Sequence, residues 1–176
     1  MDGMPERARP SKRLDAETPV TVRICRADEV EVIAATEPPG REYARRTYQR
    51  QTEGRCLYLV AWAGTVPVGS GELEWSTPPE LMNLHVRADS RGLGIGSKLV
   101  AAAEEACRGH RAIRIGVADD NPAAARLYER LGYVRTGETV TDSYAYVDDA
   151  GVRHHATEVS AYLVKDLSAT VPPVGV

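Results

Sequence analysis

Short apolar runs alternate along the chain with segments in which apolar residues recur at the spacing of a helix. The runs predict seven strands, at residues 20–25, 57–63, 67–75, 80–87, 112–118, 133–141 and 157–165. The helical spacing predicts helices near residues 29–35 and 42–51, after the glycines at 92–96, and over residues 122–131. Strands that alternate with helices in this way are typical of a mixed α/β fold built in layers.

The last two predicted helices carry the clearest local signals. Asn121 suits an N-cap, Pro122 suits the first helical position, and Gly132 suits a left-handed C-terminal cap. The helix after the glycines is predicted from four apolar residues at helical spacing: Ile95, Leu99, Ala102 and Ala106.

The length of 176 residues predicts a single domain, which we place at residues 19–167. Residues 1–18 combine prolines and cancelling charges with almost no large apolar group, and are predicted to be a disordered tail. Residues 168–176 are predicted to be a frayed end.

Charge and cysteine content exclude several function classes. The net charge of -3 argues against nucleic acid or an anionic membrane as a partner. There is no apolar run of about 18 residues, as a membrane span needs, and no apolar stretch near the first residue, as a signal peptide needs. Cys25, Cys56 and Cys107 are odd in number and widely spaced, which predicts neither a disulfide framework nor a zinc site and favours the reducing cytoplasm.

The most informative motif runs from Arg91 to Lys98, where a predicted strand gives way to a helix, and contains glycines at 92, 94 and 96. Glycines allow a tight turn, and the free amides and dipole of a helix N-terminus favour a phosphate group. The glycine spacing fits neither a P-loop, because Lys98 and Ser97 stand in the wrong order, nor the G-x-G-x-x-G dinucleotide fingerprint.

Two motifs resemble the GNAT superfamily of acetyltransferases. Arg91, Gly94 and Gly96 fill its R/Q-x-x-G-x-G/A turn, and residues 121–133 resemble its N-x-x-A-x-x-L-Y-x-x-x-G-F/Y signature. The resemblance spans residues 20–165 and is specific over residues 80–133. It implies an α/β (α+β) fold: a mixed, mostly antiparallel sheet of about seven strands, splayed in the middle and flanked by helices.

The resemblance also implies acetyl-CoA as cosubstrate, with no metal. The strand segment at 84–86 would pair with the pantetheine arm, the glycine turn would bind the phosphates, and Asn121 and Arg126 would give further contacts. Asn121 is equally well explained as a helix cap and Arg126 as a solvated side chain. The expected cofactor-binding residues are Leu84, His85, Val86, Arg91, Gly92, Leu93, Gly94, Ile95, Gly96, Ser97, Asn121 and Arg126.

Acetyl transfer to an amine needs proton acceptance, because an alkyl amine with a pKa of about 10.4 is neutral in only about one molecule in 10³ at pH 7. The resemblance places Tyr128 where relatives carry a general acid near the CoA sulfur, although a helix aromatic that packs on a sheet explains it too. Some relatives carry a glutamate base where this chain has Gly116; Glu80 matches the base of another branch. Glu72 and Glu74 project from one strand face and are further candidates.

His85 is a weaker candidate base, and the pair His154 and His155 lacks a third ligand for a metal. The sequence therefore predicts an N-acetyltransferase of a primary amine, with Tyr128, Glu80 and Glu72 as catalytic candidates. A small cationic metabolite or antibiotic is the expected acceptor if the glutamates line its cleft. A protein N-terminus or lysine is an alternative, a non-catalytic acyl-CoA sensor is another, and dimers in the family suggest a homodimer.

Overall fold

A computed structural model describes residues 18–148 and 152–168. The predicted tail at residues 1–18 and frayed end at 168–176 lie, apart from Thr18 and Ser168, outside the described residues. In the described part of the chain no helix is long and apolar enough to cross a membrane.

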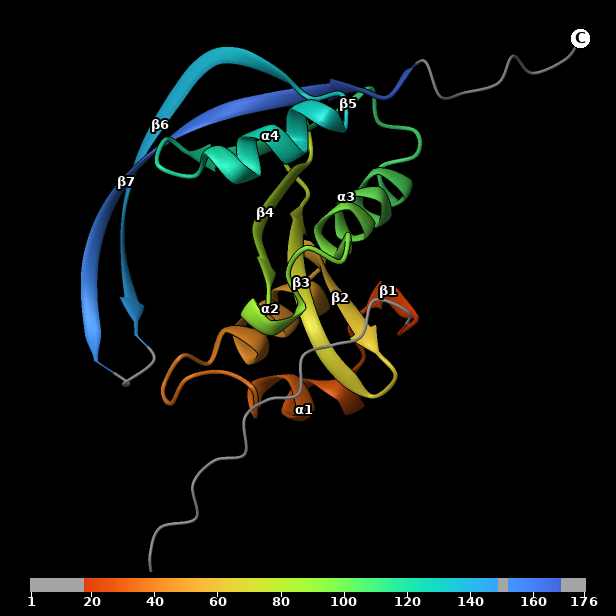
Figure 1. Ribbon diagram of the computed structural model, residues 1–176, viewed down its shortest axis with the longest axis vertical. Coiled ribbons are helices and arrows are strands. Elements are labelled where there is room, and N and C mark those ends of the chain that lie inside the picture. The colour runs from red at the N-terminus through yellow and green to blue at the C-terminus, as the bar shows by residue number, and fades with distance from the viewer. Residues whose placement is uncertain (1–17, 149–151, 169–176) are drawn as a thin grey trace, which may run out of the picture.

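Seven strands form one sheet in the order β1-β2-β3-β4-β5-β7-β6 (Figure 1). Every neighbouring pair is antiparallel except β4 and β5, which are parallel. The expected α/β fold with a mixed, mostly antiparallel seven-stranded sheet is therefore confirmed. The strands are β1 (Val20–Ile24), β2 (Cys56–Ala63), β3 (Val66–Glu74), β4 (Glu80–Val86), β5 (Ala112–Ala118), β6 (Val134–Val147) and β7 (Arg153–Asp166).

The sheet opens between β4 and β5. Only two residue pairs join these strands, Glu80 with Arg114 and Leu81 with Ile115. Beyond Leu81 the strands diverge, which is the splay that the sequence resemblance implies (Figure 1). The divergence leaves main-chain groups of β4 without a partner strand on that edge, a position that an extended ligand can use.

Helices cover both faces of the sheet. On one face α3 (Ile95–Ala106) and α4 (Pro122–Arg130) pack on a core that includes Leu81, Ile113 and Leu163. On the other face α1 (Val30–Ala34) and α2 (Tyr43–Thr52) cover Tyr58, Val60 and Trp62. Short 3₁₀ turns, Ala27–Glu29 and Ala88–Ser90, precede α1 and the glycine turn.

The local signals in the sequence predict both ends of α4 correctly. The Asn121 side chain accepts a hydrogen bond from the Ala124 amide at 3.1 Å, as an N-cap does. Pro122 opens α4, and Gly132 follows it with a φ of 90°.

The last two strands are much longer than expected, since each has 14 residues. Their outer halves pair with each other from Asp142 with Glu158 to Val147 with Arg153, and form a curved arm beside the rest of the molecule (Figure 1). The sequence hides this extension, because side chains exposed on both faces need no alternation of apolar and polar residues.

Candidate active site

The turn between β4 and α3 presents unpaired main-chain amides. Gly92 and Gly94 have φ values of 80° and 74°, which glycine adopts without steric cost. Gly94 is the N-cap of α3, and the Lys98 amide donates to its carbonyl at 3.1 Å. The amides of residues 95–97 precede that bond and have no helical acceptor, so together with the helix dipole they favour an anion.

The turn is both open and anchored. A Cβ added at Gly92 or Gly94 would meet no atom within 4 Å, so a ligand can approach the backbone. Arg91 donates through Nε to the Val86 carbonyl at 3.1 Å, which ties the turn to the end of β4. Ile95 is buried in the core on the other side. These features fit the diphosphate of coenzyme A, and they bring the predicted residues 91–97 together.

The segment of β4 that leads to this turn is irregular. Asn83 has a φ of 53°, and the pairing of β4 with β3 changes register between Ser70 and Glu72. After the change, Ser70 pairs with His85. Residues 84–86 thus stay bonded to β3 on one edge, while their other edge faces the divergence from β5. This is the place expected for the pantetheine arm.

Tyr128 reaches the core from α4 and is only 5% exposed. Its ring lies 6.1 Å from that of Tyr133. No residue in the described ranges forms a hydrogen bond with its hydroxyl. Burial raises the pKa of Tyr128 to about 12, so the hydroxyl keeps its proton at neutral pH and can donate it.

Glu80 lies where β4 and β5 begin to separate and is 7% exposed. Its carboxylate is paired with Arg114, at 2.7 Å from Nε and 2.6 Å from Nη2. The Arg114 guanidinium also lies over the ring of Tyr162, 4.7 Å from its centre. The two charge-assisted hydrogen bonds fix the direction of this buried carboxylate.

Glu72 lies on the same face but is fully enclosed, at 1% exposed. It forms an ion pair with Arg50 of α2 and accepts hydrogen bonds from the Tyr43 hydroxyl at 3.4 Å and the Asn83 amide nitrogen at 3.2 Å. Arg50 also binds Glu74 at 2.6 Å. The two glutamates do share a face, as expected, but their contacts fix α2 and the irregular part of β4 to the sheet.

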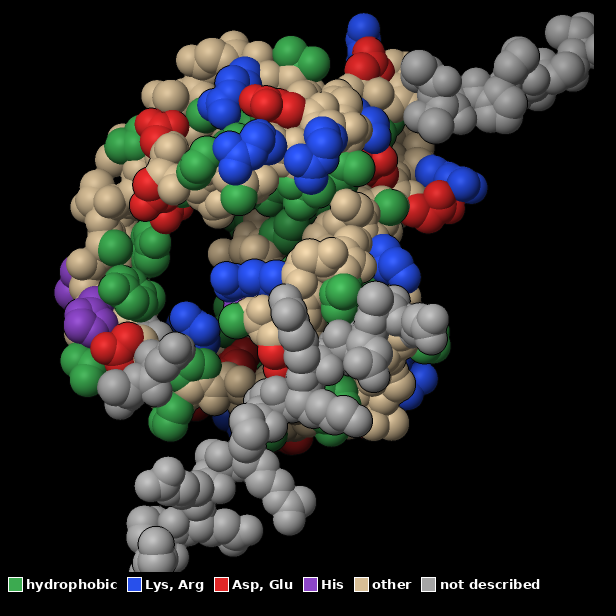
Figure 2. Space-filling view, viewed as in Figure 1, with side chains coloured by type: hydrophobic (Ala, Val, Ile, Leu, Met, Phe, Trp, Pro, Cys, Tyr) green, Lys and Arg blue, Asp and Glu red, His purple; other side chains and the backbone are tan. Residues whose placement is uncertain are grey.

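A cavity of about 870 Å³ opens beside β4. Its walls come from the loop between α1 and α2, from β3 and β4, and from the arm formed by β6 and β7. Figure 2 shows a hollow between this arm and the rest of the molecule, with Lys and Arg side chains at its edge. His85 and Asn83 line the cavity, whereas Glu72, Glu74 and Glu80 do not.

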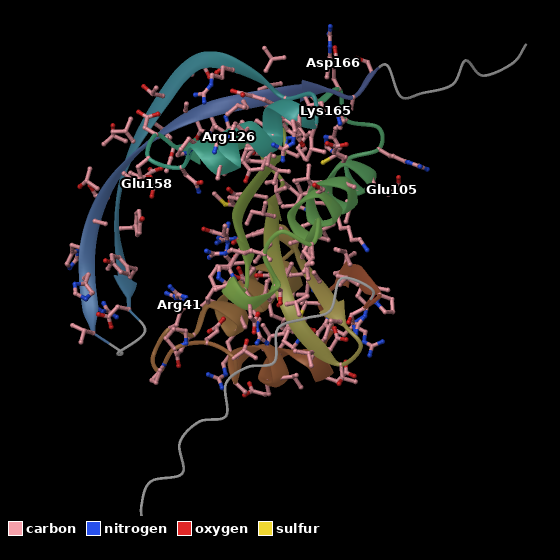
Figure 3. All side chains as sticks on the ribbon, viewed as in Figure 1. Arg41, Glu105, Arg126, Glu158, Lys165 and Asp166 are labelled. Carbon is pink, nitrogen blue, oxygen red and sulfur yellow. The ribbon has the colours of Figure 1, made fainter. Side chains whose placement is uncertain are left out.

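Asn121 and Arg126 lie apart from that cavity. They line a smaller one of about 170 Å³ at the start of α4. Figure 3 labels Arg126 on the outer side of α4, and in Figure 2 further Lys and Arg side chains gather over this helix. His154 is paired with Asp148 at 2.7 Å, and no group of three metal-ligating side chains exists among the described residues.

Sequence comparison assigns the family. Residues 24–133 match the profile of the Acetyltransferase (GNAT) family. The chain is a GNAT acetyltransferase. It is therefore an acyltransferase that uses acetyl-CoA, and the family's acceptors are amines of small molecules or proteins. No protein of curated function matches the sequence.

Solved structures share the fold of this GNAT protein at low identity. An N-acetyltransferase from Staphylococcus aureus Mu50 has a TM-score of 0.65 and 17% identity, over 85% of this chain and 99% of that one. Spermidine/spermine N-acetyltransferase SpeG from Vibrio cholerae has a TM-score of 0.64 and 15% identity, over 89% and 97%. yncA from Salmonella typhimurium, solved with its cofactor acetyl-CoA, has a TM-score of 0.60 and 18% identity, over 90% and 99%.

Local motifs in the sequence indicate the turn, the β4 segment and Tyr128 as candidate site residues. They miss lining residues of the large cavity on two sides: Arg41 in the loop between α1 and α2, and Tyr144, Tyr146 and Arg153 in the arm. Arg41 is over a hundred positions away from the three arm residues in the chain. Only the curvature of the long β6 and β7 brings them together, and no local pattern signals it.

Proposed function

We propose that this GNAT enzyme transfers the acetyl group of acetyl-CoA to a primary amine of a small molecule in the cavity beside β4. The observation that carries the proposal is the common position of three features at the opening of the sheet. A turn with free amides lies at one end of β4, the strand edge at residues 84–86 that leads to it has no partner strand, and the cavity opens beside that edge at Leu84 and His85.

Acetyl-CoA supplies the activated thioester, and the chain supplies the contacts that orient it. The amides of residues 95–97 are suited to its diphosphate, and the free edge of β4 at Leu84 and Val86 to the amides of its pantetheine arm. Leu93 is partly buried against the core and supports the turn from below. Asn121 and Arg126, at the start of α4, are further candidates for contact with the cofactor.

Tyr128 is the proposed proton donor to the departing thiolate. Its hydroxyl is protonated at neutral pH, and within the described residues no neighbour engages it in a hydrogen bond. A group with these properties needs no rearrangement before it donates a proton.

Glu80 is the proposed acceptor of the amine's proton, through a water molecule. The carboxylate lies at the point of divergence, and Arg114 holds its direction. His85 is the competing candidate, because it lines the cavity. Glu72 is proposed as a positioning residue instead, since Arg50, Tyr43 and Asn83 occupy its carboxylate.

The shape of the cavity favours a small acceptor over a protein. Three separate parts of the chain partly enclose it, whereas a protein N-terminus or lysine is best served by an open groove. The expectation of a cationic acceptor depended on Glu72, Glu74 and Glu80 as lining residues, and each of them is instead paired with an arginine. Buried, unpaired Cys25, Cys56 and Cys107 suit a reducing compartment, and we propose the cytoplasm.

Release of free CoA thiol in the presence of acetyl-CoA and a panel of amines tests the proposal. We expect amine-dependent release and a mass increase of the accepted amine by one acetyl group. Calorimetry with acetyl-CoA alone gives the binding constant. Tight binding with no turnover on any amine would support the acyl-CoA sensor instead, and no binding would overturn both.

A further inference from the structure

The walls of the large cavity carry an excess of positive charge. Four arginines line it, at positions 41, 46, 87 and 153, against two glutamates, at positions 37 and 42. Figure 3 shows that Arg41 extends from the loop between α1 and α2 towards the arm of β6 and β7. The excess lies in the space that an acceptor would occupy.

Internal contacts neutralise some of these charges but not all. Both oxygens of Glu37 accept main-chain amides at the start of α2, from Tyr43 at 2.9 Å and Ala44 at 2.7 Å. Arg87 is paired with Asp89 at 2.6 Å. These contacts leave fewer negative than positive groups free to meet a ligand.

Among the four lining arginines, Arg41 and Arg153 have neither a partner of opposite charge nor a side-chain hydrogen bond in the part of the chain that the structure describes. Neither has a carboxylate within ion-pair distance among residues 18–148 and 152–168. Arg46 uses one nitrogen to donate to the Arg41 carbonyl at 2.9 Å, which leaves its charge uncompensated. Glu42 is exposed and is the one lining carboxylate with no contact that satisfies it in the described chain.

This arrangement distinguishes between kinds of amine. A cation such as a polyamine would bring a further positive charge among the arginines, at a cost that grows in a partly enclosed space. A carboxylate would gain from the same field, and a guanidinium can bind it through two parallel hydrogen bonds. Tyr144 and Tyr146, which are exposed, and the partly buried Tyr43 also line the cavity and offer aromatic surface to an apolar side chain.

We infer that the acceptor is an amino acid or a close relative, whose carboxylate is bound by Arg41 and Arg153 while its amine faces β4. The inference rests on the proposed acetyltransferase function and names its substrate class. Arg41 and Arg153 come from opposite walls, so one anion between them would also join the loop and the arm. They act as specificity-determining residues and take no part in proton transfer.

Matched pairs of substrates give the most direct test. Each proteinogenic L-amino acid is compared with its own carboxamide in the thiol-release assay, and spermidine serves as the cationic reference. We expect the best acid to exceed its amide in kcat/KM by at least about tenfold, mainly through KM, as expected for loss of a charge-assisted contact. Amides that match their acids, or a preference for spermidine, would overturn the inference.

Variants assign the preference to the two arginines. Arg41→Gln and Arg153→Gln should each raise KM for the preferred acid by about tenfold and leave KM for its amide and the affinity for acetyl-CoA within about twofold. Arg45→Gln is the matched control, because Arg45 is exposed, is paired with Glu31 at 2.7 Å and does not line the cavity. An unchanged acid preference in both cavity variants would contradict the assignment.

A binding measurement separates this inference from the proposed function. The N-acetylated amino acids and their amides, which need no chemistry, are titrated in the presence of CoA and followed by thermal stabilisation. Acids that stabilise the protein more than their amides support the charge selection even if no amine is acetylated. Equal stabilisation by acids and amides would overturn it, whatever the activity assay shows.

Discussion

The Glu80 carboxylate lies beside an empty position on the neighbouring strand: a Cβ built on Gly116 would stand 3.9 Å from Glu80 Oε1. The family resemblance gives these two positions as alternative places for a glutamate base. The structure shows that they are adjacent in space, although they lie on different strands. The lack of a side chain at Gly116 therefore does not leave this part of the site without a carboxylate, because Glu80 supplies one from β4.

Replacement of Glu80 tests its role in proton acceptance. We expect Glu80→Gln to lower kcat by about 10² to 10⁴, the range typical of a lost general base, with little change in acetyl-CoA affinity. Glu74→Gln is a matched control, since Glu74 lies on the same sheet face, is also paired with an arginine and is more exposed. Thermal unfolding of both variants separates catalysis from the loss of the Arg114 pair. A kcat within threefold of the parent would exclude the role, on the scale of general base effects.

Tyr128→Phe removes the proposed proton donor and keeps the ring. We expect kcat to fall by about 10² or more, while the acetyl-CoA dissociation constant changes by less than about threefold. Tyr133→Phe is the control, because its ring is also buried and lies 6.1 Å away. If both variants lose activity to the same extent, the hydroxyl of Tyr128 has no special part in the reaction.

Gly94→Val should weaken acetyl-CoA binding. A β-branched residue is strained at a φ of 74°, at a cost of about 1–2 kcal/mol, and its side chain would stand in the open space over the amides. We expect a loss of affinity of about tenfold or more in calorimetry. Gly109→Val imposes comparable strain, with a φ of 95° and open surroundings, at the far end of α3. Equal affinities in the two variants would rule out the turn as the phosphate site.

His85 should make the protein less stable in mild acid. Burial, and then the charges of Arg91 and Arg41, lower the pKa of His85 below its ordinary value. The unfolded chain, with a His pKa of about 6.5, therefore takes up a proton more readily than the folded chain as the pH falls. The free energy of unfolding should decrease below about pH 6.5, and His85→Gln should reduce that decrease.

Urea titrations at several pH values measure this effect. The same variant also tests His85 as a base. Because we assign proton acceptance to Glu80, we expect His85→Gln to retain kcat within about tenfold at pH 8, below the effect of losing a general base. A larger loss, together with an unchanged rate in Glu80→Gln, would move the role to His85.

Local motifs in the sequence predicted much of the fold. Strand β5 was predicted with its observed bounds, and α4 was defined by Asn121 and Gly132, because caps and alternation depend only on nearby residues. The length of β6 and β7 could not be predicted, since their outer halves are exposed on both faces and are held by pairing with each other.

The candidate site likewise has one part that local sequence predicts and one part that depends on tertiary contacts. The glycine turn is a contiguous motif that the sequence shows directly, whereas the partners of the glutamates depend on tertiary contacts. Nothing in the sequence near Glu72 indicates that Arg50, 22 positions earlier, neutralises it. Arg114 lies 34 positions after Glu80 and pairs with it only because β4 and β5 are adjacent. The sequence therefore predicts correctly that the candidate carboxylates share one face of the sheet. It does not predict which of these carboxylates are paired with an arginine.

Because only two residue pairs join β4 and β5, the sheet consists of two halves, β1 to β4 and β5 to β7, that are connected over a short stretch. The half with β1 to β4 carries the glycine turn, Glu80 and the loop with Arg41, and the half with β5 to β7 carries Arg153 and leads into the helix with Tyr128. The proposed reacting groups are thus divided between the two halves of the sheet. A pantetheine arm bound between β4 and β5 and an acceptor bound between Arg41 and Arg153 would each contact both halves of the sheet. Binding of the two substrates would therefore itself improve the alignment of the proposed reacting groups.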